Sequence, residues 1–99
     1  MPFPPHDRTP DLHTWLTDSK ARTRSERDAA ATQPTDTSEF LSGRVDCQTF
    51  TLDELDQGVT ADDIMGLVDQ SVTDYIASAD SLQRVKGYAS MAADIYDFL

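Results

Sequence analysis

The C-terminal end of the chain carries an apolar face too wide for one neighbouring helix to cover. If positions 81–98 are placed at 100° per residue, the apolar side chains span an arc of about 200°. They are Leu82, Val85, Tyr88, Ala89, Met91, Ala92, Ile95, Tyr96, Phe98 and Leu99. Such a helix is either central and packed on several sides, or partly covered by a partner. We therefore expect a small, mainly α-helical domain built around this segment.

A second amphipathic helix precedes it. Thr60, followed three positions later by Asp63, is typical of a helix start with an acid in its first turn. The apolar positions that follow share one face, and they are Ile64, Met65, Val68, Val72, Tyr75 and Ile76. Near positions 77–80 this stripe loses its phase, and Ser78 or Asp80 is able to cap a new helix. The pattern predicts a C-terminal helical hairpin, with one long bent helix as the alternative.

The N-terminal part predicts an extended helical arm at residues 9–31. Thr9 is a suitable N-cap, Pro10 suits the first helical position, and three apolar side chains then fall on one face. After these the only apolar side chains in the arm are alanines, so we expect its second half to be solvated or loosely held. Residues 1–8 predict a poorly ordered tail, and the polar residues 32–38 predict a linker.

Residues 39–50 give a mixed signal. Positions 39–41 fit a helical turn that ends at Gly43, whereas the alternation over 45–50 is typical of a strand. A single strand has no partner strand in this chain. We therefore expect irregular structure here, at the start of an acidic helical body that spans residues 39–99.

The acidic charge is concentrated in that body. The chain has 18 Asp and Glu against 8 Lys and Arg, a net charge of -10 over 99 residues. Residues 1–30 are balanced and include a basic stretch at 20–27, so the whole excess lies in residues 31–99. This charge disfavours nucleic acid as a direct ligand. It is typical of a protein from a salt-adapted (halophilic) microbe or its virus, although scarce lysine and absent asparagine also follow from a GC-rich genome.

Several features predict the compartment. The sequence has no run of about 18 apolar residues, so we expect no membrane span. Its start lacks the basic segment and apolar stretch of a secretory signal. Cys47 is the only cysteine, which excludes an intramolecular disulfide and fits a reducing environment. We therefore expect a cytoplasmic protein with no membrane partner.

Motifs for catalysis or metal binding are not evident. His6 and His13 are the only histidines, and neither has a Cys or carboxylate at a metal-ligand spacing. The acidic run at 53–56, followed by Gly58, lacks three of the ligand positions of a calcium-binding loop. We therefore expect no catalytic residues, no bound metal and no cofactor.

These observations favour a non-enzymatic interaction module, namely an adaptor, inhibitor or assembly subunit that binds a protein partner or forms a homo-oligomer. The apolar residues predicted to contact the partner are Leu12, Trp15, Leu16, Tyr88, Met91, Ile95, Phe98 and Leu99. One alternative is an acidic mimic of nucleic acid, an inhibitor or antitoxin that blocks a basic protein surface. The acids predicted for that role are Asp62, Asp63, Asp69, Asp74, Asp94 and Asp97. Another alternative is a structural component of a viral or other large assembly.

Overall fold

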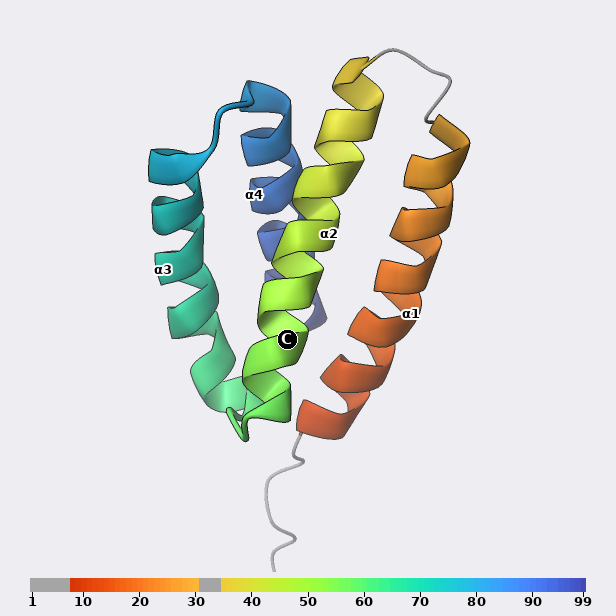
Figure 1. Cartoon of the computed structure of the whole chain (residues 1–99). Helices are drawn as coiled ribbons and strands as arrows, with labels where there is room; N and C mark the ends of the chain where they lie inside the picture. The colour runs from red at the N-terminus through yellow and green to blue at the C-terminus, as the bar shows by residue number, and fades with distance from the viewer. Residues whose placement is uncertain (1–7, 31–34) are drawn as a thin grey trace, which may run out of the picture.

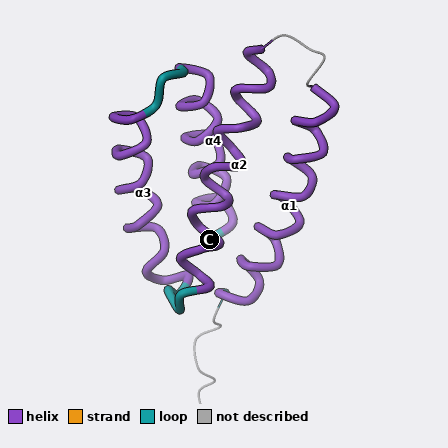
Figure 2. The backbone as a smooth tube through the Cα atoms, in the orientation of Figure 1, coloured by secondary structure: helices purple, strands orange, loops and turns teal. Residues whose placement is uncertain are grey.

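The protein is a four-helix assembly, seen in a computed structural model that describes residues 8–30 and 35–99. The described helices are α1 (Thr9–Ala29), α2 (Thr35–Asp56), α3 (Ala61–Ser78) and α4 (Leu82–Phe98), and no strand occurs among these residues. The expected mainly-α class is therefore confirmed. Figure 1 shows α2 and α4 in the middle, with α1 on one side and α3 on the other. Short loops join α2 to α3 at one end and α3 to α4 at the other (Figure 2).

Helix α2 overturns the expectation of irregular structure at residues 39–50. The whole segment is helical, and Gly43 lies inside the helix instead of ending it. The reason is a close crossing of α2 and α4. A Cβ atom at Gly43 would lie 2.0 Å from the backbone oxygen of Arg84, and one at Gly87 would lie 1.9 Å from the backbone oxygen of Phe40. The two glycines therefore allow the helix backbones to touch, and this packing offsets the weak helix propensity of glycine.

The core lies between the central helices and their two neighbours. Its fully buried side chains include Leu12, Leu16, Cys47, Ile64, Val68, Met91 and Ile95. Helix α4 packs on α2 and α3, but Leu82 and Tyr96 on one of its flanks are 67% and 49% exposed. The wide apolar face of α4 is thus only partly used by the fold.

Helices α3 and α4 form the predicted hairpin, so the single bent helix is excluded. Ala79 has the extended conformation that ends α3. The cap of α4 is Ser81, whose Oγ accepts a hydrogen bond from the backbone N–H of Arg84 at 3.3 Å. The two caps expected from the sequence, Ser78 and Asp80, lie before this position.

Helix α1 packs along α2, and its second half is held more firmly than expected. Ser19 and Thr23 are buried, and the Nε2 of Gln48 donates a hydrogen bond to the Oγ1 of Thr23 at 3.1 Å. Small polar side chains thus bring α1 close to α2 in place of large apolar ones. Most other side chains of this half are exposed, as expected, so the difference from the expectation is confined to the stripe that faces α2.

The ends of the predicted segments also shift. The N-cap of α1 is Arg8, not Thr9. The Oγ1 of Thr9 instead accepts a hydrogen bond from the backbone N–H of Ala61 at 2.9 Å, at the start of α3. Positions 35–38 of the expected linker belong to α2. The rest of that linker at 32–34, and the tail up to residue 7, lie outside the described residues.

Candidate functional site

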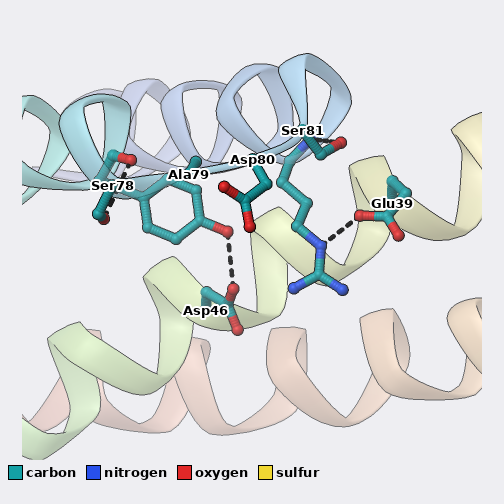
Figure 3. Close-up of a pocket in the computed structure, with 8 residues that line it drawn as sticks. Glu39, Asp46, Ser78, Ala79, Asp80 and Ser81 are labelled. Atoms are coloured by element: carbon teal, nitrogen blue, oxygen red, sulfur yellow. Dashed lines mark hydrogen bonds and ion pairs between the residues drawn. The ribbon is translucent and has the colours of Figure 1, made fainter.

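A pocket of about 500 Å³ lies where the turn between α3 and α4 meets α2. Arg84 donates from its Nε to the carboxylate of Glu39, and the hydroxyl of Tyr75 donates to Asp46 Oδ2 at 2.7 Å. Figure 3 shows the Asp80 carboxylate directed toward α2, on the side where Glu39 and Asp46 lie. Both polar contacts join α2 to the hairpin, so the pocket wall fixes the position of the turn.

Two stacked tyrosines extend from this pocket into the protein. The rings of Tyr75 and Tyr88 are stacked with centroids 4.1 Å apart, and the Tyr88 hydroxyl donates to Ser71 Oγ at 2.7 Å. Burial raises the pKa of Tyr75, and its hydrogen bond to Asp46 raises that pKa further. Burial also raises the pKa of Tyr88 to about 12. Both phenols therefore stay neutral near pH 7 and serve as hydrogen-bond donors inside the fold.

The chemistry available in the pocket is limited by these internal contacts. Three carboxylates, of Glu39, Asp46 and Asp80, surround the single guanidinium of Arg84. Two of the three already accept hydrogen bonds from protein groups. Among the described residues, no group of three or more His, Cys, Asp or Glu side chains could hold a metal ion. The polar side chains of the pocket therefore serve mainly to hold the hairpin against α2.

A second candidate surface is apolar and lies on the outer side of the hairpin. At 100° per residue, Leu82, Ala89 and Tyr96 fall on one side of α4, because they are seven positions apart. The Tyr96 hydroxyl donates to the carboxylate of Asp69 on α3, which shows that this side of α4 adjoins α3. We call this surface the outer hairpin face, and it comprises Met65, Val72, Ile76, Leu82, Val85, Ala89, Ala93 and Tyr96.

Most of the apolar residues predicted for partner contact lie inside the protein. Five of them are 3% exposed or less, namely Leu12, Leu16, Tyr88, Met91 and Ile95. Trp15 and Phe98 stack on each other with centroids 4.7 Å apart and join α1 to α4. Leu99 alone among the eight is exposed, at 37%. A partner could therefore reach the five core side chains only if the helices separated.

The side chains that sequence reasoning did not select are the exposed ones. Ile76 is 54% exposed, Leu82 67% and Tyr96 49%. All three belong to the apolar faces recognised in the sequence. At 100° per residue, Leu82, Ala89 and Tyr96 lie on a different side of α4 from the buried positions 88, 91 and 95. The sequence thus places these three residues together, but it does not show that their side of α4 stays uncovered.

Three of the six predicted acids border that face. On α3, Asp62 and Asp69 are exposed on the flank next to Ile76. On α4, Asp97 is exposed beyond Ala93, and Lys86 lies on the same flank. The apolar face is therefore edged mostly by carboxylates.

The other three predicted acids lie elsewhere. Asp94 forms an ion pair with Arg44 of α2, with Oδ2 and the terminal guanidinium nitrogen 2.7 Å apart. Asp63 and Asp74 lie on the opposite flank of α3, where each lines a different shallow cavity. The six acids therefore do not form one continuous row.

Comparison with known proteins gives no match: no family model, no curated protein and no solved structure matches this chain. Within residues 8–30 and 35–99, none of the helices has the length and apolar character needed to cross a bilayer.

Proposed function

We propose that this chain is a non-enzymatic protein–protein interaction module, an adaptor, inhibitor or assembly subunit, that binds its partner through the outer hairpin face. The observation that supports this most strongly is the exposure of Ile76, Leu82 and Tyr96 on this one face, each about half exposed or more. Single exposed apolar residues are ordinary, whereas a contiguous apolar patch is typical of a contact surface.

Folding alone does not explain these apolar side chains. Leu82 is 67% exposed, so a polar residue there would leave the core unchanged. Full burial of a Leu or Ile side chain contributes about 1.5–3 kcal/mol, and roughly half of that remains to be gained at Leu82 and Ile76. A partner that covered them would gain this energy. Docking therefore gives these residues a role that the isolated fold does not.

The acidic-mimic alternative has less support. A mimic of nucleic acid presents regularly spaced negative charges along one surface. Here Asp63 and Asp74 lie away from Asp62 and Asp69, and Asp94 is paired with Arg44. An apolar contact edged by acids fits the described surface better, and a subunit of a viral or other large assembly would use the same face. We propose that the contact is made in the cytoplasm, where Cys47 would stay reduced.

The test is site-specific photo-crosslinking in cells that produce the protein. A benzoylphenylalanine at position 82 should give a discrete covalent adduct with a partner, because that side chain lies on the outer hairpin face. The same group at exposed position 14, on the side of α1 opposite the buried Leu12 and Leu16, is the control. The proposal fails if position 82 gives no adduct, or if positions 14 and 82 give the same adducts in equal yield.

A further inference from the structure

We propose that the occupant of the outer hairpin face is an amphipathic helix of a partner protein, with an apolar stripe flanked by Lys and Arg. This inference rests on the proposed function, because it names the kind of segment that the face would bind. Helices commonly bind other proteins by laying an apolar stripe into a groove between two helices.

The shape of the face fits a helix. Ala89 and Ala93 are exposed near the middle of α4, between Leu82 toward one end and Tyr96 toward the other. Small side chains at the centre allow a third helix to approach closely, as small residues do wherever helices pack tightly. A helix of α4's length extends about 25 Å at 1.5 Å per residue. The face is therefore long enough to bind a helix of about five turns, and it has large apolar side chains at both ends.

The charge at the edges selects a basic occupant. Residues 61–99 contain seven acids and two bases, Arg84 and Lys86. Arg84 is already paired with Glu39 in the neighbouring pocket, so Lys86 is the base left beside the face. The edges otherwise carry Asp62 and Asp69 on α3 and Asp97 on α4. Charge complementarity across an interface favours partners of opposite sign and suppresses those of like sign.

One of these carboxylates is placed to accept a further donor. Asp69 receives the Tyr96 hydroxyl at its Oδ2 atom. Its Oδ1 atom has no hydrogen-bond partner among the described residues, and the side chain is exposed. A lysine or arginine on the flank of a docked helix would reach this oxygen without breaking the contact to Tyr96.

A second copy of this chain is a poorer occupant. Two copies would bring like-charged edges together, and each carries a net charge of -10. Repulsion of this kind weakens as salt rises, whereas attraction between opposite charges is weakened by salt. The two occupants therefore predict opposite salt dependence.

The probe is a pair of synthetic helical peptides that share one leucine stripe and differ only in their flanking residues, Lys and Arg in one and Glu in the other. Amide chemical shifts of the isotope-labelled full chain report the contact surface, and titration gives the Kd. We expect the basic peptide to shift α3 and α4 resonances on the outer hairpin face. Its affinity should fall with added salt, and the Glu-flanked peptide should bind at least tenfold more weakly.

Matched variants distinguish specific binding at the outer hairpin face from non-specific attraction of a basic peptide to an acidic protein. The double variant Asp62→Asn/Asp69→Asn should weaken the basic peptide roughly fivefold. The control Asp18→Asn/Asp53→Asn removes the same charge from exposed sites on α1 and α2, and it should change the Kd less than twofold. Leu82→Ser should weaken binding about tenfold, while Leu67→Ser, on the opposite flank of α3, should not.

Three results would overturn this inference: equal weakening by the two double variants, equal binding of both peptides, or self-association through the hairpin that strengthens with salt. The last result would leave the proposed function standing with a different occupant. Failure of the proposed function itself is detected separately, by the absence of an adduct from position 82 in cells.

Discussion

The crossing of α2 and α4 gives the sharpest stability prediction, made with the substitution Gly87→Ala. The added Cβ would lie 1.9 Å from the backbone oxygen of Phe40 and 3.2 Å from the backbone nitrogen of Arg44. Both atoms belong to the backbone of α2, so no side-chain rotation relieves the overlap. Because ordinary contact begins at 3.4 Å, the helices must separate by roughly 1.5 Å at their crossing, in an interior that is otherwise close-packed.

The expected loss follows from two opposing effects. Overpacking a well-packed interior costs about 1–3 kcal/mol, and more where backbone must move. Separation of the helices also disturbs the ion pairs Arg44–Asp94 and Arg84–Glu39, which join α2 to α4 on either side of the crossing. Alanine has a higher helix propensity than glycine, and this offsets about 1 kcal/mol of the loss. We expect a net loss of about 2–4 kcal/mol, a large share of the 5–15 kcal/mol that is typical of such domains.

Urea unfolding followed by circular dichroism measures this loss. The matched control is Gly66→Ala on α3, where an added Cβ meets nothing within 4 Å. Because this glycine is exposed and helical, the control should stabilise the protein by up to about 1 kcal/mol. The two Gly→Ala substitutions should therefore change the free energy of unfolding in opposite directions. The close crossing is refuted if Gly87→Ala is as stable as the wild type, or if both variants lose stability equally.

Four further predictions concern the interior. Ile95→Ala, at a fully buried core position, should cost about 2–5 kcal/mol in urea unfolding, and a loss below 1 kcal/mol would contradict its place in the core. Gln48→Met should cost less than about 1 kcal/mol in the same assay, although Gln48 is fully buried. The variant loses the hydrogen bond from Nε2 to Thr23 Oγ1, but it also removes the buried Oε1 atom, which has no hydrogen-bond partner among the described residues. A loss above about 3 kcal/mol would contradict this balance. Burial raises the pKa of Cys47 to about 12, so a thiol reagent at pH 8 should label it only when urea unfolds the chain, and fast labelling of the native protein would refute that burial. The pKa of Tyr88 rises from 10.0 to about 12 on folding. Its contribution to stability is therefore complete below pH 10 and is lost as the pH rises toward 12. Tyr88→Phe should flatten the fall in unfolding free energy between these pH values, and an unchanged slope would contradict the pKa shift.

The helical hairpin was predictable because amphipathic periodicity is a local signal. The apolar positions of α3 and α4 recur at helical spacing, and neither helix needs a distant residue to be recognised. Helix α2 was missed because its evidence is not local. Gly43 resembles a helix end when viewed alone, and its role becomes clear only once Gly87 is known to lie opposite. The buried polar residues Gln48 and Thr51 further obscure the apolar pattern of α2.

The second half of α1 and the outer hairpin face were hidden for related reasons. Ser19 and Thr23 look like solvent-facing residues, because their burial depends on α2. The width of the apolar arc on α4 indicated that some of it would stay uncovered. Which part stays uncovered depends on where α2 and α3 pack, so Leu82 and Tyr96 could not be distinguished from buried Tyr88 and Met91 by sequence alone.

The most direct test of the outer hairpin face as a docking surface compares folding and contact in one variant, Leu82→Ser. We predict a free energy of unfolding within about 0.5 kcal/mol of the wild type, because Leu82 is 67% exposed. We also predict that the partner adduct from a photo-crosslinker at position 96 is lost. A loss of more than 2 kcal/mol in stability together with an unchanged adduct would show that Leu82 serves the fold and not the contact.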